Sequence, residues 1–131
     1  ESAPLPAPKS TPLTLGTITY YFRTHFNFNA GNTEGLRLEA HTVIDDGAVI
    51  YLNGNPVLWI GMDANAVIGY STGAARTVGD ANNEGPFPIS TTNLVAGDNL
   101  LAVEVHQSSS GSSAFSLLYV ASFISSYGAS W

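Results

Sequence analysis

Hydrophobic and polar side chains alternate along several short stretches of this chain, which is the two-residue repeat of a β-strand with one buried face. The repeat is clear in residues 17–28, where the even-numbered positions are mostly apolar or aromatic, and it returns in 36–43 and 100–107. We expect a strand in each of these three ranges. Shorter apolar segments predict further strands at 56–62, at 87–89 on a sheet edge, and at about 114–123.

Two turn signals, Asp46-Gly47 and Asn53-Gly54, bracket the strand-forming sequence Val49-Ile50-Tyr51. Glycine adopts positive φ at no steric cost, and Asn and Asp do so at little, so each pair suits a tight turn. We therefore expect a β-hairpin in this region, with a positive-φ turn at each end of its strand.

The rest of the chain predicts connections and no helix. Residues 63–85 are rich in Gly, Asn and Ala and predict a long connection, and no stretch shows a convincing helical repeat. Residues 1–16 contain four prolines, which fix φ and remove N–H donors, so this segment should be extended. We divide the chain into a Pro-rich arm or linker at 1–16 and one all-β domain at 17–131.

The order of four sequence segments resembles a known family. They are Tyr20-Tyr21-Phe22-Arg23, Leu38-Glu39-Ala40-His41, DDGAVIYLNG at 45–54 and AGDNLLAVEVHQ at 96–107. With them the chain is similar to the galactose-binding-like jelly-roll modules of secreted bacterial proteins. The resemblance covers about residues 17–123 and implies an antiparallel jelly-roll β-sandwich, which the extended Pro-rich N-terminal arm precedes. It also implies a module that binds carbohydrate or mediates adhesion, because few such modules act alone as catalysts.

Composition narrows the classes of function. Charged residues make up 11% of the chain, against about 25% in an ordinary soluble domain, and this balance favours a secreted, extracellular or cell-surface protein. The net charge of −6 repels phosphate backbones, so we expect no nucleic-acid partner. No apolar run approaches the ~18 residues of a membrane span, so we expect no membrane insertion. The absence of cysteine excludes disulfides and thiolate chemistry.

Ionisable side chains are concentrated on two of the expected strands. Arg37, Glu39 and His41 share one face of the strand at 36–43, and Glu104 and His106 share one face of the strand at 100–107. The two groups would converge if the strands were neighbours. A carboxylate with an imidazole can serve acid–base chemistry or bind a metal, but a structural polar network is the commoner outcome and is our expectation.

Two further motifs suggest chemistry and each has a simpler explanation. Asp45 and Asp46 could contribute to a structural calcium site, which is the one cofactor we consider, but they more often accept backbone N–H bonds in a turn. Residues 69–73 match the nucleophile pattern G-x-S-x-G, which needs a strand-to-helix turn that this chain does not predict. We therefore expect no catalytic residues and no enzyme.

Four aromatic residues are candidates for stacking on a sugar ring, namely Tyr51, Trp59, Tyr70 and Tyr127. An exposed ring offers a flat apolar face to the C–H groups of a sugar, whereas most aromatic residues of a sandwich belong to its core. Both interpretations stay open at this point.

The sequence supports two functions of different classes. In the first, the chain is a structural subunit that assembles with copies of itself into a filament or surface layer, its arm packing on a neighbour or adding a strand to it. In the second, it is a carbohydrate-binding module of a larger secreted enzyme, with polysaccharide as partner and the arm as linker. The residues expected at a subunit interface are Leu5, Leu13 and Leu15 of the arm and Tyr127 and Trp131 near the C-terminal end.

Overall fold

The computed structural model describes residues 13, 14, 16–29, 33 and 35–111, and the backbone of 123–125. These residues form an all-β domain, as predicted. No helix among them is long and apolar enough to cross a membrane. The strands of the domain are β1 (Thr19–Phe28), β2 (Leu36–Val43), β3 (Gly47–Leu52), β4 (Asn55–Ile60), β5 (Asn83–Ile89), β6 (Gly97–His106) and β7 (Phe123–Ser125).

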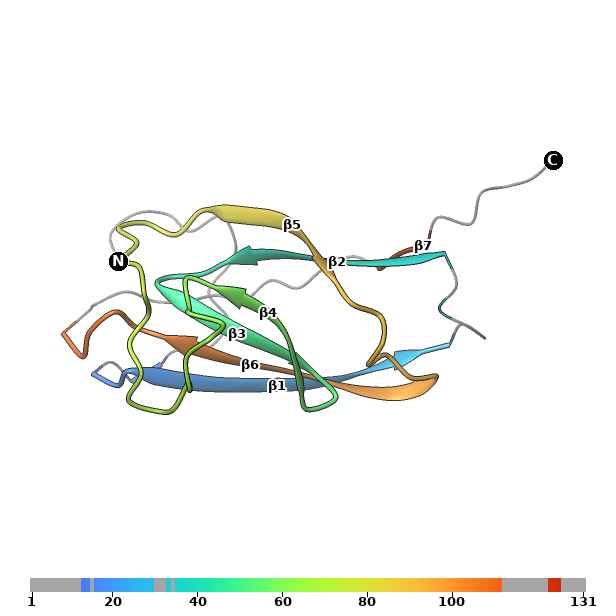
Figure 1. Ribbon diagram of the computed structural model, residues 1–131, viewed down its shortest axis with the longest axis horizontal. Coiled ribbons are helices and arrows are strands. Elements are labelled where there is room, and N and C mark those ends of the chain that lie inside the picture. The colour runs from blue at the N-terminus through green and yellow to red at the C-terminus, as the bar shows by residue number, and fades with distance from the viewer. Residues whose placement is uncertain (1–12, 15, 30–32, 34, 112–122, 126–131) are drawn as a thin grey trace.

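The strands are arranged in two layers (Figure 1). The first sheet has the order β1-β6-β3-β4 and the second the order β5-β2-β7, with every pairing antiparallel. Apart from the β3–β4 hairpin, each strand is followed by one in the other sheet. This alternation is the jelly-roll pattern of a β-sandwich, and it confirms the predicted fold class.

The predicted alternation decides which side chains enter the core. In β1 the residues of one parity, including Phe22 and Phe26, are half-buried, while Tyr21 and Arg23 between them are exposed. Successive residues of a strand point to opposite faces, so every second residue can enter the core between the sheets. This core has two clusters of buried residues. One cluster contains Ile44, Ala48, Ile50, Ile60, Val103 and Val105, and the other contains Leu38, Ala40, Leu52, Ile89 and Leu94.

The Asn53-Gly54 turn joins β3 to β4, as predicted. Both residues have positive φ, 51° for Asn53 and 81° for Gly54, which is the conformation that a two-residue hairpin requires. The Asn53 side chain then fixes the turn to the neighbouring chain, since it accepts from the Leu100 N–H at 2.8 Å and donates to the Asn99 side chain at 2.8 Å.

The prediction for Asp46-Gly47 was wrong, because this pair is no hairpin turn. It lies where the chain passes from β2 in the second sheet to β3 in the first, and Gly47 does not have a positive φ. Glycine is needed there for another reason. A Cβ on Gly47 would lie 2.7 Å from the Met62 sulfur and 2.9 Å from the Gly61 carbonyl oxygen, too close for any side chain.

Two further strands differ from their predicted bounds. β5 is longer than the predicted 87–89, because Gly85, Pro86 and Pro88 hide the strand pattern, while its place on a sheet edge makes missing N–H donors harmless. Most of the last predicted strand, at 114–122, lies outside the described residues, and β7 follows it and pairs with Leu36–Leu38 of β2. The arm at 1–16 also lies outside them, except for residues 13, 14 and 16.

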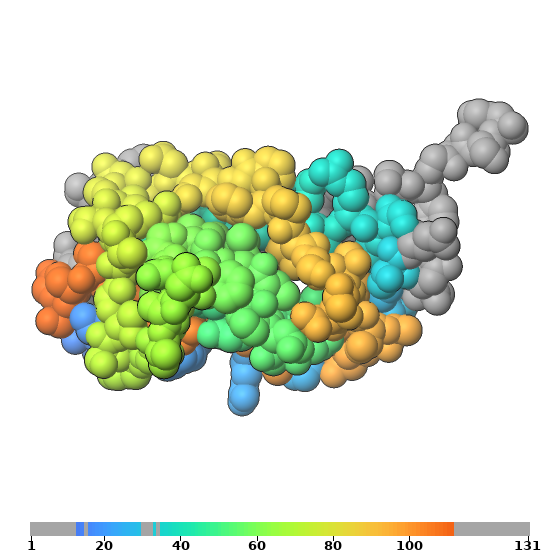
Figure 2. Space-filling model, in the orientation of Figure 1, coloured from blue at the N-terminus to red at the C-terminus, as the bar shows by residue number. Residues whose placement is uncertain are grey.

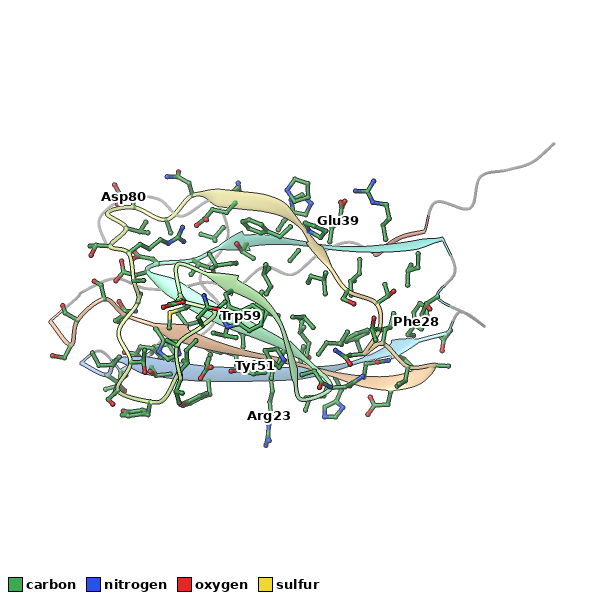
Figure 3. All side chains as sticks on the ribbon, viewed as in Figure 1. Arg23, Phe28, Glu39, Tyr51, Trp59 and Asp80 are labelled. Atoms are coloured by element: carbon green, nitrogen blue, oxygen red, sulfur yellow. The ribbon has the colours of Figure 1, made fainter. Side chains whose placement is uncertain are left out.

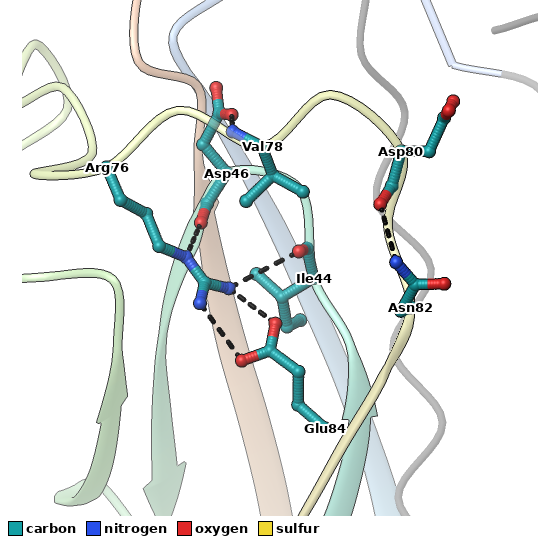
Figure 4. A network of polar contacts seen from close by, with 7 residues as sticks. All are labelled: Ile44, Asp46, Arg76, Val78, Asp80, Asn82 and Glu84. Carbon is teal, nitrogen blue, oxygen red and sulfur yellow. Dashed lines mark hydrogen bonds and ion pairs between the residues drawn. The ribbon is translucent and has the colours of Figure 1, made fainter.

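The connection between β4 and β5 spans 61–82, against the predicted 63–85, and contains no strand. It packs on the end of the sandwich, where it covers the tip beside β3 and β4 (Figure 2). Arg76 anchors this connection to the sandwich. It forms a bidentate ion pair with Glu84 at 2.6 and 2.9 Å and donates a hydrogen bond to the Asp46 carbonyl oxygen at 2.7 Å (Figure 4). A bidentate, charge-assisted pair is among the stronger polar contacts in proteins. The connection is therefore held in one position against β3.

The Asp46 carboxylate is the second group that anchors the connection. It is fully buried, and its two oxygens accept the N–H groups of Val78 at 2.6 Å and Ser108 at 2.7 Å. Burial raises the pKa of Asp46, but the N–H bonds from Val78 and Ser108 outweigh it and bring the pKa below its ordinary value. The side chain thus joins the connection to the chain that leaves β6.

We predict that Asp46→Asn destabilises the fold by roughly 2–3 kcal/mol, because one of the two N–H donors would then face an amide NH₂ group. A carboxylate with a lowered pKa stabilises the folded state above its unfolded pKa, and this contribution disappears as the pH falls through the lower folded value, below about 4. Urea denaturation from pH 3 to pH 7 measures both effects. The exposed Asp80→Asn is the matched control, and equal stability of the two variants would contradict the prediction.

Candidate ligand groove on the first sheet

The outer face of the first sheet gathers aromatic and charged side chains from all four strands. The pairing register places Tyr21, Glu104, Val49 and Trp59 in one row across β1, β6, β3 and β4. Their neighbours along the strands, such as Val103 and Ile50, point into the core. One parity of each strand therefore lies on the same face of the sheet, where Val49 is itself buried.

The next row of this face is hollow in the middle. Arg23 of β1 and Tyr51 of β3 flank Ala102 of β6, which is their common partner in the register. A methyl group between two long side chains leaves a depression, and the structure has an open groove of about 440 Å³ there. Its walls and floor include Tyr21, Arg23, Tyr51, Leu100, Ala102 and Glu104.

A hydrogen bond from Tyr51 fixes the wall of the groove. The Tyr51 hydroxyl donates to Oε1 of Glu104, a carboxylate whose residue is 8% exposed. Burial and this bond to the Glu104 carboxylate raise the pKa of Tyr51 to about 12. Tyr51 is thus a neutral donor at all physiological pH values, and its ring is held in one orientation.

The connection that follows β4 closes one end of this face. The Thr19 hydroxyl donates to the Tyr70 carbonyl oxygen at 2.6 Å, and Nδ1 of His106 lies 2.7 Å from the Thr72 carbonyl oxygen. A carbonyl can only accept, so Nδ1 carries the proton. His106 is completely buried, and its Nε2 lies 3.5 Å from Oε2 of Glu104. The buried His106 therefore links the groove wall to the connection.

The G-x-S-x-G segment belongs to the connection that closes this end of the sheet face. Residues 69–73 form a turn within the connection, where the Gly69 N–H donates to the Thr72 hydroxyl at 2.9 Å. No helix follows the segment in the described part of the chain, so it lacks the context in which a serine nucleophile works.

The two ionisable groups that the sequence suggested do not converge. Arg37, Glu39 and His41 lie on the outer face of the second sheet, whereas Glu104 and His106 lie on the first. Figure 3 shows Glu39 on the far side of the sandwich from Arg23. Arg37 and Glu39 pair with each other at 2.7 Å. The expected single network is therefore two separate ones, because β2 and β6 belong to different sheets.

The Asp45 and Asp46 pair does not fit a calcium site. Both residues are fully buried, and both Asp46 oxygens accept backbone N–H bonds that a cation would have to displace. Within the described residues, no three His, Cys, Asp or Glu side chains are grouped to hold a metal ion. The backbone-accepting role that the sequence favoured applies to Asp46, although its donors are distant in the chain and do not belong to a local turn.

The aromatic candidates have different places. Tyr51 lines the groove, Trp59 is half-buried on the same face but outside the groove lining, and Tyr70 is 56% exposed on the connection. Figure 3 labels both Tyr51, which is on β3, and Trp59, which is on the edge strand β4. Sequence reasoning missed Tyr21, which is 61% exposed, and Arg23 and Ala102. Strand parity alone placed each of these residues on an outer face. It could not show that all three lie on the same face of the same sheet.

Of the five residues expected at a subunit interface, the structure describes one. Leu13 is half-buried, and the other four, Leu5, Leu15, Tyr127 and Trp131, lie outside the described residues.

Comparison with models of protein families, with curated proteins and with solved structures finds no match to this chain. The similarity to galactose-binding-like modules therefore stays a prediction from the sequence.

We predict that Tyr51→Phe weakens the fold and changes its response to alkali. A group whose pKa rises from an ordinary 10 to about 12 on folding stabilises the folded state fully below pH 10, and this contribution is lost as the pH rises through 12. The stability difference between wild type and Tyr51→Phe should therefore shrink between pH 10 and pH 12.

Urea denaturation at pH 8, 10 and 11.5 measures this difference. The control is Tyr70→Phe, on an exposed tyrosine of the connection. A difference for Tyr51→Phe that stays constant over this range would show that the hydroxyl does not act through Glu104.

Proposed function

We propose that this domain is a non-catalytic carbohydrate-binding module that acts outside the cell and binds polysaccharide in the groove of the first sheet. The observation that carries the proposal is the pairing row in which Ala102 lies between Arg23 and Tyr51, next to the row that joins Tyr21 to Glu104. This row makes a depression with aromatic walls and charged groups at its sides.

The chemistry of the groove suits a sugar ring. Tyr21 and Tyr51 offer apolar faces to sugar C–H groups, while Glu104 and Arg23 supply an acceptor and several donors for hydroxyl groups. Small-molecule sites commonly combine apolar walls with a few fixed polar groups in this way.

The groove is also preorganised for binding. Its residues lie on β-strands, and the Tyr51–Glu104 hydrogen bond fixes one wall before any ligand arrives. Less side-chain and loop freedom is then lost on binding, which increases affinity for a given contact area.

Binding is favoured over hydrolysis by the number of carboxylates. Glycoside hydrolysis generally uses two carboxyl groups on either side of the scissile bond. Glu104 is the one carboxylate among the residues that line the groove in the described structure, and its Oε1 already accepts the Tyr51 hydroxyl.

Self-assembly into a filament through the arm remains a separate proposal. Its argument rests on the arm and the C-terminal segment, of which the structure describes few residues, and nothing in the described fold adds support to it. The groove does not depend on either segment.

We expect binding to a panel of soluble polysaccharides, measured by affinity electrophoresis and titration calorimetry, to be lost in Ala102→Leu. The larger side chain would fill the depression between Arg23 and Tyr51 without entering the core. Tyr21→Ala should weaken binding by about tenfold or more, as truncation of an aromatic anchor does.

The matched control is Ala96→Leu, which adds the same atoms at an exposed turn outside the groove lining. If a polysaccharide binds wild type and Ala102→Leu equally, the groove is not its site. If nothing in a broad panel binds the wild type, the proposed function fails.

A further inference from the structure

We infer that the ligand of this groove is an anionic polysaccharide, whose carboxylate or sulfate group pairs with Arg23. The inference rests on the proposed function and adds the chemical class of the ligand.

Positive charges are few in this chain. The chain has four Lys and Arg residues, of which Lys9 lies outside the described residues. Arg37 pairs with Glu39 at 2.7 Å and Arg76 pairs with Glu84 at 2.6 Å. Arg23 has no ion pair with any residue that the structure describes. Among the described residues of this acidic chain, Arg23 is thus a cation without an ion pair at the edge of the aromatic groove.

Arg23 lies at the hollow of the groove. It is directly opposite Ala102 in the register, so its side chain leaves the sheet at the hollow, and Figure 3 shows it projecting away from β1. A guanidinium presents a planar fork of donors that matches carboxylate or sulfate oxygens in a bidentate pair. A ligand lying between Tyr21 and Tyr51 would place a ring substituent within reach of this fork.

The neighbouring acids do not neutralise Arg23. Glu104 is directed to the Tyr51 hydroxyl and to buried His106, and it forms no ion pair with Arg23. Asp98, at the far end of β6, pairs with His25 at 2.9 Å. Because the whole chain carries a net charge of −6, an anionic ligand would be repelled without a local cation, so Arg23 would decide whether such a ligand binds.

The test uses pairs of polymers that differ only in charge. Polygalacturonate is compared with its methyl-esterified form, and a sulfated galactan with its desulfated form, in titrations at low and high salt. We expect the wild type to bind at least one acidic polymer about tenfold more tightly than its neutral counterpart, the effect of a charge-assisted pair. The polymer pair that shows the preference identifies carboxylate or sulfate as the recognised group.

Variants assign the effect to the side chain. Arg23→Gln should remove the preference, so that the acidic and the neutral polymer of a pair bind with equal affinity, while Arg23→Lys should keep part of the preference as a point charge without the fork. The matched control is Arg37→Gln, which removes one charge from the opposite face of the sandwich and should change nothing. Thermal melting of each variant confirms that it is folded.

Two negative results have different meanings. Ala102-dependent binding of neutral polymers with no preference for acidic ones, or a preference that survives in Arg23→Gln, would overturn this inference and leave the proposed function standing. Binding of no polysaccharide at all would overturn both.

Discussion

The structure depends above all on β6, a strand with one face in the core and the other in the groove. Val103 and Val105 point into the core, and β6 pairs with β1 on one side and β3 on the other, so it holds the first sheet together. Ala102, Glu104 and His106 alternate with them on the outer face. The same two-residue repeat therefore fixes the core, the hollow of the groove and the attachment of the connection at 61–82.

Much of the fold could be predicted from side-chain parity, because a one-residue shift of any strand would turn its apolar side chains to solvent. The sequence pattern alone predicts the buried face of β1, with Phe22 and Phe26, and that of β6, with Val103 and Val105. The pair Asn53-Gly54 predicts the turn, because both residues readily adopt the positive φ that it requires. Local rules were sufficient wherever the deciding contact is close in sequence.

The candidate site could not be predicted in the same way, because its residues meet only through strand order. Parity placed Glu39 and Glu104 equally well on outer faces, and only the assignment of β2 and β6 to different sheets separates them. Asp46 shows the same limit, since its donors, Val78 and Ser108, are more than thirty residues away along the chain. A short-range turn rule could not anticipate Gly47 either, whose need for glycine comes from packing against Met62.

One face of β6 packs in the core and the other borders the groove, which also explains how such a groove can exist in a small sandwich. A hollow in the core would lose packing energy, whereas Ala102 makes its hollow on the outer face, where the missing atoms are replaced by water. The side chains that border it, Tyr21 and Arg23, are exposed and make no contribution to the buried clusters. The proposed ligand preference would thus depend on exposed residues whose exchange leaves the core intact, while Glu104, bonded to Tyr51 and next to His106, serves both the groove and the fold.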